Sequence, residues 1–157
     1  MTAALNRRTL LASLAASLTL PTRTLAEPLT EAIHVVKDPG CGCCGAWIEH
    51  LAAAGLATTV EEQDAEALAA YKLKMGVPAE LASCHTASIR GYVLEGHVPA
   101  ADIRRLLAES PDAVGLAVPG MPYGSPGMGP EAEREAYDVM LILRDGSATV
   151  YTSYPAA

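Results

Sequence analysis

The chain has 157 residues, half of them hydrophobic, four cysteines and a formal net charge of −7. This length fits one domain, and a chain of this size buries roughly two thirds of its unfolded surface, enough for a core that needs no disulfide framework. Because an acidic chain repels phosphate backbones and anionic lipid surfaces, the charge argues against nucleic acid and membranes as partners.

The first 26 residues predict an export signal. Arg7 and Arg8 precede an apolar run from Leu10 to Leu20, and small residues near Ala26 suit cleavage by a signal peptidase. The apolar run is too short to cross a bilayer, which needs about 20 helical residues. The paired arginines indicate twin-arginine export, with general secretion as the alternative. We therefore expect a periplasmic protein whose mature domain comprises residues 27–157.

The first part of this domain predicts a βαβ unit followed by a helix. Strand patterns cover Ile33–Val36 and Ala57–Val60, and apolar residues recur at helical spacing from Cys44 to Gly55. A second helix begins after an Asp64 cap and ends at Gly76-Val77-Pro78. Two strands joined in this way are expected to be parallel, with a right-handed crossover.

The next part predicts a hairpin and a third helix. The strands Thr86–Ile89 and Tyr92–Glu95 are joined at Arg90-Gly91, and a helix runs from Pro99 to Ser110-Pro111. The order βαβ, helix, ββα is that of a thioredoxin-like fold. The sequence therefore predicts an α/β domain of this class.

Two segments lie outside this minimal fold. Residues 111–130 are rich in proline and glycine, a composition that favours an ordered turn-rich loop or a mobile lid. After it, Tyr137–Leu143 and Ala148–Tyr151 flank Asp145-Gly146. This pattern predicts an added C-terminal β-hairpin with a type I′ turn.

The motif Cys41-Gly42-Cys43-Cys44 lies at the junction of the first strand and the first helix. In a βαβ context, a C-x-x-C at this place is typical of a redox pair. A helix N-terminus lowers the pKa of thiols, which favours thiolates that attack disulfides or bind metal. The third cysteine favours metal, because thiolates hold Cu(I), Zn(II) or iron–sulfur clusters.

The predicted topology brings a fourth sulfur to this motif. The strand after Cys84 runs antiparallel to the first strand, so that its beginning lies beside the end of the first. The next strand returns His97 to the same edge of the sheet. Four thiolates can bridge several Cu(I) ions or enclose one zinc. The tight C-x-C-C spacing favours bridging and makes zinc the weaker candidate.

Further residues are candidates around the cluster. His85 and His97 are either metal ligands or hydrogen-bond partners of the ligands. Met121 and Met128 either add thioether ligands for Cu(I) or seal the core. The cysteines also allow two structural disulfides, for instance Cys41–Cys44 and Cys43–Cys84, because exported compartments favour oxidation.

Three stretches resemble small bacterial periplasmic metal-binding proteins of the copper-resistance CopG type. They are Lys37–Trp47, Leu81–Thr86 and Gly91–Pro99, and residues 119–122 and 124–128 are also similar. The resemblance implies a thioredoxin-like fold and copper tolerance, with oxidoreductase activity proposed for the family. It also implies a copper cluster bridged by the cysteines, which correspond here to Cys41, Cys43, Cys44 and Cys84.

These observations predict a periplasmic copper-binding protein for copper resistance, which holds a thiolate-bridged Cu(I) cluster and cycles its oxidation state. Its expected partners are metal ions and other periplasmic copper-handling proteins. The alternative is a thiol–disulfide oxidoreductase with Cys41 as the nucleophile and Cys44 as the resolving thiol. A third hypothesis is a chaperone that hands copper to another protein. The sequence leaves open whether the protein is an enzyme.

Overall fold

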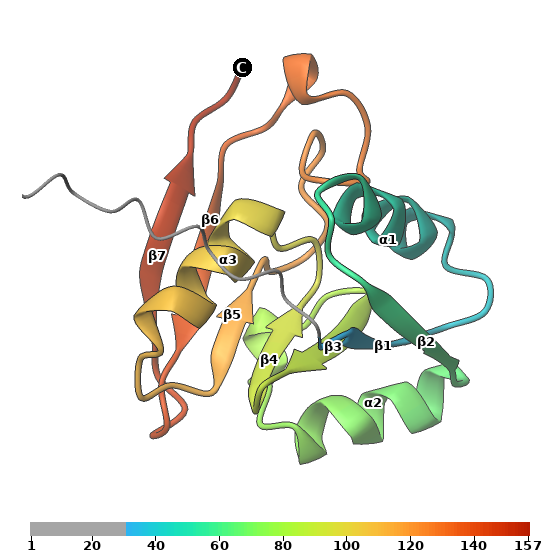
Figure 1. Ribbon diagram of the computed structural model, residues 1–157, viewed down its shortest axis with the longest axis vertical. Coiled ribbons are helices and arrows are strands. Elements are labelled where there is room, and N and C mark those ends of the chain that lie inside the picture. The colour runs from blue at the N-terminus through green and yellow to red at the C-terminus, as the bar shows by residue number, and fades with distance from the viewer. Residues whose placement is uncertain (1–30) are drawn as a thin grey trace, which may run out of the picture.

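A computed structural model describes residues 31–157, and the predicted export signal lies outside this part of the chain. One seven-stranded sheet has the order β2-β1-β3-β4-β5-β6-β7 (Figure 1). Its strands are β1 (Ile33–Lys37), β2 (Thr58–Glu62), β3 (His85–Ile89), β4 (Tyr92–Glu95), β5 (Gly115–Ala117), β6 (Tyr137–Ile142) and β7 (Ala148–Tyr154). The α-helices are α1 (Gly42–Ala53), α2 (Ala65–Lys74) and α3 (Ala100–Glu109), and short 3-10 turns cover Ala79–Leu81 and Glu131–Glu133. Within residues 31–157, no helix has the length and apolar character that a bilayer crossing requires.

The first four strands and the three helices form the predicted α/β arrangement. β1 pairs in parallel with β2 and antiparallel with β3, and β3 pairs antiparallel with β4. Asp64 caps α2 as predicted, because its carboxylate accepts the N–H of Ala67 at 2.9 Å. Arg90 and Gly91 both have positive φ, 49° and 80°, as the tight turn between β3 and β4 requires.

The main core lies between one face of the sheet and the helices α1 and α3. Trp47 and Leu51 of α1 and Ile103 and Leu106 of α3 are fully buried there against strand residues. The indole N–H of Trp47 donates to the carbonyl of Val98 at 2.8 Å, so its polar atom is satisfied inside the core. This packing fixes α1 on the sheet and, with it, the position of the cysteine motif at the N-terminus of the helix.

The Gly/Pro-rich segment contains a strand that the sequence analysis missed. β5 pairs in parallel with β4 and antiparallel with β6, so the C-terminal hairpin continues the same sheet. Gly115 begins this strand, and a Cβ there would overlap the backbone of Val93. The close approach of the two backbones explains a glycine inside a strand. Later in the segment, Pro126 lies against His97 and Gly127 against α1.

The turn between β6 and β7 differs from the predicted type I′ turn. Gly146 has a φ of 85°, but Asp145 is not among the residues with positive φ. Gly146 N–H donates to the carbonyl of Leu143, and Leu143 N–H donates to that of Ser147, which is the pattern of a type I turn followed by a G1 bulge. The Asp145 carboxylate accepts both the N–H and the hydroxyl of Ser147. These bonds hold Asp145 in the ordinary φ region, so the type I′ prediction is wrong.

Candidate metal centre

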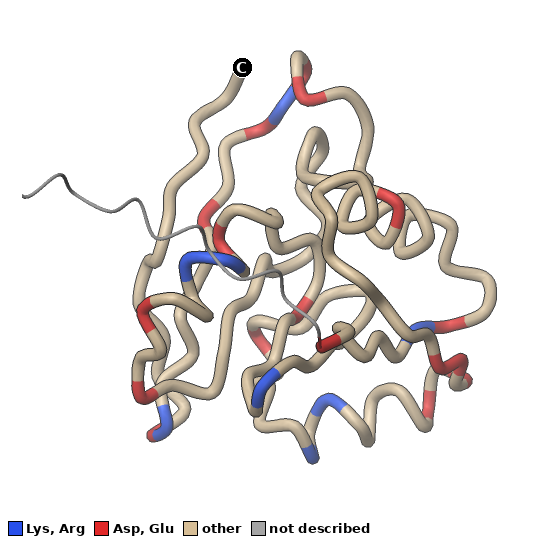
Figure 2. The backbone as a smooth tube through the Cα atoms, in the orientation of Figure 1, with Lys and Arg blue, Asp and Glu red and all other residues tan. Residues whose placement is uncertain are grey.

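The cysteine motif is held by the turn that leads from β1 into α1. The carbonyl of Asp38 accepts the N–H of Cys41 at 3.0 Å, and its carboxylate accepts the N–H of Gly40 at 2.8 Å. α1 begins at Gly42, two residues earlier than predicted, with Cys41 as the N-cap and no side chain bonded to the helix end. Cys43 and Cys44 therefore lie in its first turn, close to the positive end of the helix dipole. Glu49 is the only Asp, Glu, Lys or Arg in the sequence of α1, and the tube of this helix is mostly tan in Figure 2.

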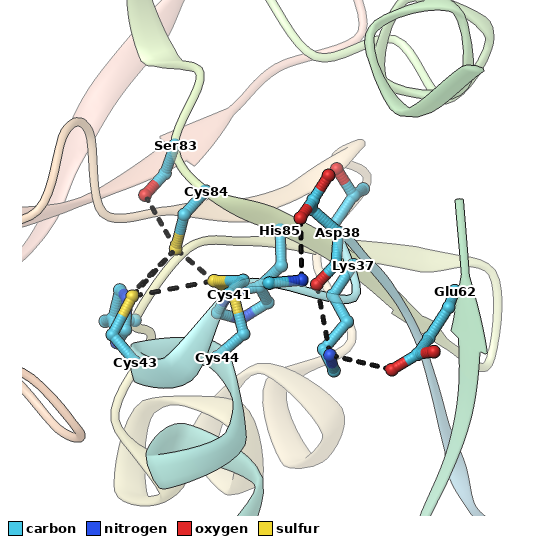
Figure 3. The surroundings of a disulfide bond; sticks show 12 residues. Lys37, Asp38, Cys41, Cys43, Cys44, Glu62, Ser83, Cys84 and His85 are labelled. Atoms are coloured by element: carbon cyan, nitrogen blue, oxygen red, sulfur yellow. Dashed lines mark hydrogen bonds and ion pairs between the residues drawn. A yellow bond between two sulfur atoms is a disulfide. The ribbon is translucent and has the colours of Figure 1, made fainter. Parts of the chain in front are cut away.

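Four cysteine sulfurs meet at this helix end (Figure 3). The Sγ atom of Cys43 lies 3.6 Å from that of Cys41 and 3.9 Å from that of Cys84, and all four sulfurs lie within 4.8 Å of one another. Cys84 therefore lies beside the motif, as the strand directions predict. Of the two disulfides considered above, Cys41–Cys44 is formed, whereas Cys43 and Cys84 are free thiols.

Two buried histidines contact Cys84. Its sulfur lies 3.0 Å from Nε2 of His97 and 3.3 Å from Nδ1 of His85. Nδ1 of His97 lies 2.7 Å from the carbonyl oxygen of Pro126 and donates to it. In a neutral ring this leaves Nε2 as an acceptor that faces the sulfur. Cys84, His85 and His97 thus form a second group whose candidate ligand atoms lie within 4.8 Å of one another.

His85 also has an unsatisfied atom. Its ring packs on Trp47 with the centroids 4.4 Å apart, and the residue is fully buried. Its Nε2 is buried and has no hydrogen-bond partner, and no other buried side-chain nitrogen or oxygen within residues 31–157 lacks one. The ring atom that faces the thiols is Nδ1, 3.3 Å from the Cys84 sulfur, and the unpaired Nε2 is a different atom of the same ring.

Burial dominates the electrostatics of these groups. It raises the pKa of Cys84 to about 12, and the neighbouring Cys43 adds to the shift. It lowers the pKa of His85 to about 3, helped by the charges of His97 and Lys72, and it also lowers the pKa of His97. At neutral pH both imidazoles are therefore neutral, with lone pairs free for a metal. The expected lowering of thiol pKa values does not extend to Cys84, which enters from β3 and not from the helix end.

The Gly/Pro-rich segment packs on this site. Gly127 has a φ of +85°, and a Cβ there would lie 2.6 Å from the backbone nitrogen of Trp47. The hydroxyl of Ser83 donates to the carbonyl of Gly120 on the same segment. Met121 is 54% exposed and therefore does not seal the core, whereas Met128 is half-buried. That either thioether adds a copper ligand stays a prediction. The role of the segment that the contacts support is to hold the Pro126 carbonyl against His97.

The sequence analysis missed a buried ion pair next to Cys84. Glu95 is fully buried, with an exposed fraction of 0%, and its carboxylate lies 2.6 Å from Nζ of Lys72. The same carboxylate accepts the N–H of Ser83 and the hydroxyl of Thr86, each at 2.6 Å. A signal was present, because Glu95 is a charged residue at the end of an otherwise apolar strand, two positions before His97.

The arrangement is suited to two kinds of chemistry. Four sulfurs and two neutral imidazoles are soft and borderline donors for a metal such as Cu(I) or Zn(II). A disulfide with a third thiol 3.6 Å from one of its sulfurs is also suited to thiol–disulfide exchange. The number of donors that converge exceeds what exchange requires.

Two solved structures are similar to this chain, and both are named copper resistance protein CopG. The structure named Form 1 is 48% identical, with a TM-score of 0.74, and the match covers 80% of this chain and 98% of that chain. The structure named Form 2 is 49% identical, with a TM-score of 0.73, and the match covers 79% of this chain and 98% of that chain. Residues 81–128 match a family model described as a protein of unknown function, DUF411. No curated protein matches the chain.

Proposed function

Because the chain belongs to the family of the copper resistance protein CopG, we propose that it binds copper and acts in copper resistance. The observation that carries this proposal is the convergence of four cysteine sulfurs within 4.8 Å. Soft thiolates prefer Cu(I) among the available first-row metals. The predicted export signal supports a periplasmic location, where the partners would be copper ions and other copper-handling proteins.

Cys41, Cys43, Cys44 and Cys84 are the proposed ligands, as thiolates that bridge more than one Cu(I). Two thiolates that share one ion at a metal–sulfur distance of about 2.3 Å lie roughly 4 Å apart. The separations of 3.6 and 3.9 Å between neighbouring sulfurs agree with this spacing. Three cysteines within four residues suit bridging better than a tetrahedron around one zinc, because the short loop restricts the angles between the sulfurs.

His97 is the proposed nitrogen ligand beside this cluster. Histidines that bind metals usually donate their other ring N–H to a carbonyl or carboxylate, which fixes the tautomer and the ring orientation. His97 makes such a bond to Pro126 and turns Nε2 toward the sulfur of Cys84. His85, whose Nδ1 lies 3.3 Å from this sulfur, is the second candidate.

Copper loading requires reduction of the Cys41–Cys44 disulfide, since only thiolates bridge the ions. A partner dithiol would attack one sulfur, and its second thiol would then resolve the mixed disulfide. The partner leaves as a disulfide, and Cys41 and Cys44 become thiols that gain two electrons and two protons in total. Cys41 is the accessible point of attack, because it is half-buried whereas Cys44 is fully buried.

The second candidate function is thiol–disulfide exchange without a metal. It is favoured by the disulfide itself, in which Cys41 is the half-buried and therefore accessible partner. In this function Cys41 and Cys44 alternate between disulfide and dithiol, and a partner dithiol or disulfide is oxidised or reduced in exchange. Cys84 and the histidines then have no chemical role.

The test is to reduce the purified protein, add Cu(I) without oxygen and count the copper bound against a competing chelator. We expect more than one copper per chain, and less than one would contradict the proposal. The variants Cys43→Ser and Cys84→Ser separate the two functions. They should lose most of the bound copper if the cluster is correct, whereas they should retain exchange activity if the Cys41–Cys44 pair acts alone.

A further inference from the structure

We infer that Glu95 is a positioning residue for Cys84: its carboxylate holds the segment Ser83–Thr86 so that the Cys84 sulfur faces the other three. The inference rests on the proposed function for the identity of the metal. The claim that Glu95 positions Cys84 does not depend on the metal, because the contacts of Glu95 are present without one. It assigns a role in the metal site to a residue whose side chain is not a ligand.

The carboxylate of Glu95 grips this segment on both sides of Cys84. One oxygen, Oε1, accepts the backbone N–H of Ser83 at 2.6 Å, and the other, Oε2, accepts the hydroxyl of Thr86 at 2.6 Å. Cys84 and His85 lie between these two anchor points. Ser83 precedes β3, so its N–H lies outside the strand ladder and takes a side-chain acceptor instead.

The strand that ends at Glu95, β4, also leads to His97, the second residue that contacts the Cys84 sulfur. Beyond Glu95 the chain passes through Gly96 to His97, whose Nε2 lies 3.0 Å from the Cys84 sulfur. Gly96 has a φ of +70°, and a Cβ there would lie 2.6 Å from the Cβ of Ser83 and 2.7 Å from the carbonyl of Val118. Gly96 N–H also donates to the carbonyl of His85 at 3.0 Å. The two segments that bring Cys84 and His97 together are therefore packed as one unit around Glu95.

Stability alone does not account for this ion pair. Lys72 has a side chain that is only 13% exposed, and Glu95 is fully buried. Taking both charges out of water costs free energy that their attraction often fails to recover, and an apolar pair of similar volume is commonly as stable. What an apolar residue at position 95 would not provide is an acceptor for the Ser83 N–H. That bond is the part of the network directed at Cys84.

A second buried carboxylate provides the matched control. Asp102 on α3 is 4% exposed and accepts the hydroxyls of Thr152 at 2.6 Å and Tyr154 at 2.7 Å. It joins α3 to β7, the edge strand that β4, β5 and β6 separate from β3, the strand that follows Cys84 (Figure 1). A change at Asp102 removes a buried carboxylate with its hydrogen bonds but leaves the cysteine segment untouched.

The experiment compares two double variants, Glu95→Gln/Lys72→Met and Glu95→Leu/Lys72→Met. Both remove the two charges at similar volume, but only glutamine retains an acceptor for the Ser83 N–H. In competition with a Cu(I) chelator, the leucine variant should lose about 10- to 100-fold in copper affinity, the range typical for residues that orient metal ligands. The glutamine variant and Asp102→Leu should bind copper as the wild type does.

A second readout needs no copper. In the reduced protein, we expect Cys84 of the leucine variant to be alkylated severalfold faster than in the wild type, measured by peptide mass spectrometry. The rate at Cys84 should not change in Asp102→Leu. If the leucine variant does not fold, Thr86→Val removes the second anchor and should shift both readouts in the same direction by a smaller amount.

The outcomes separate the two claims. If the wild type binds no copper, the proposed function fails, and the alkylation rates still test the role of Glu95. If the wild type binds copper and the leucine variant matches it in affinity and in alkylation rate, the inference about Glu95 is wrong. Equal losses in the leucine and glutamine variants would also overturn it, because the Ser83 acceptor would then be irrelevant.

Discussion

Two regions of the sheet differ in how many of their polar side chains have bonding partners. Where β1, β3 and β4 meet α1, the thiols of Cys43 and Cys84 are free, and Nε2 of His85 lacks a hydrogen-bond partner. Where α3 meets β6 and β7, Asp102 accepts two hydroxyl groups, and Tyr154 both donates to it and stacks on Tyr137 with the centroids 4.9 Å apart. The first region keeps two thiols outside any disulfide and one unpaired nitrogen, whereas in the second the Asp102 carboxylate is satisfied by two hydroxyl groups.

This difference distinguishes a site from a support. Buried polar groups that satisfy one another rigidify a fold, whereas groups left unsatisfied cost free energy unless a ligand occupies them. The free thiols at the cysteine end therefore agree with the metal site proposed above. The Asp102 end continues the sheet through β5 and anchors the Gly/Pro-rich segment, which in turn places the Pro126 carbonyl against His97.

The largest effect that would sharpen this comparison concerns Gly127. Replacing it with alanine adds a Cβ 2.6 Å from the Trp47 backbone nitrogen at a φ of +85°. Backbone strain and the clash together should lower the free energy of unfolding by about 3 kcal/mol or more. The neighbouring Pro126 carbonyl should also move away from His97, so copper affinity should fall. Denaturant unfolding and chelator competition measure the two effects.

Gly146→Ala is the control for this change. Gly146 has the same φ of +85°, but its Cβ would meet nothing within 4 Å. It should therefore cost only the backbone strain, about 1 kcal/mol, and leave copper binding unchanged. Equal losses of stability in the two variants would mean that the contact of the loop with α1 contributes nothing, and the link between the two ends would be wrong.

Much of the cysteine end could be predicted from the sequence, because its signals are local. Asp64 marked the start of α2, Arg90-Gly91 marked the turn between β3 and β4, and the strand directions brought Cys84 to the motif. The sharing of one edge by Cys84 and His97 followed from topology alone. The arrangement of the first four strands is therefore encoded in short patterns with clear chemical causes.

The parts that escaped prediction depend on distant contacts. β5 is three residues long and starts at a glycine, so its pairing with β4 and β6 outweighs a local composition that favours turns. In the sequence Glu95 is only the last residue of a strand. Its role depends on Ser83, Thr86 and Lys72, which the fold brings into contact with it. Which pair of cysteines forms the disulfide also depends on three-dimensional distances that the spacing does not determine.

A smaller effect follows from the neutral state of His85. Its pKa is lowered to about 3 in the folded protein from the ordinary 6.5. Below pH 6.5 the unfolded chain takes up a proton that the folded chain does not, so stability is fully present above pH 6.5 and falls as the pH drops toward 3. The loss should be about 1.4 kcal/mol for each pH unit, as measured by denaturant unfolding of the reduced, metal-free protein.

His85→Gln isolates this contribution. Glutamine does not titrate, so the stability of the variant should decrease less steeply below pH 6.5, by about 1.4 kcal/mol per unit. The lowered pKa of His97 contributes in the same direction and stays present in both proteins. If the wild type and the variant lost stability in parallel between pH 6.5 and 5, His85 would not be held neutral in the folded protein. The contrast between the two regions would then lose its support from His85.

The smallest effect is expected at the Asp102 end itself. Tyr154→Phe removes the hydroxyl that donates to Asp102 at 2.7 Å and retains the ring that stacks on Tyr137. Asp102 keeps its bond from Thr152, so the cost should be about 1 kcal/mol, the value of one hydrogen bond, without a change in copper affinity. Calorimetric unfolding and chelator competition on the same samples measure both quantities. A fall in copper affinity would show that the two ends are coupled through β7 and the Gly/Pro-rich segment, in which case the far end of the sheet would be part of the metal site and not only its support.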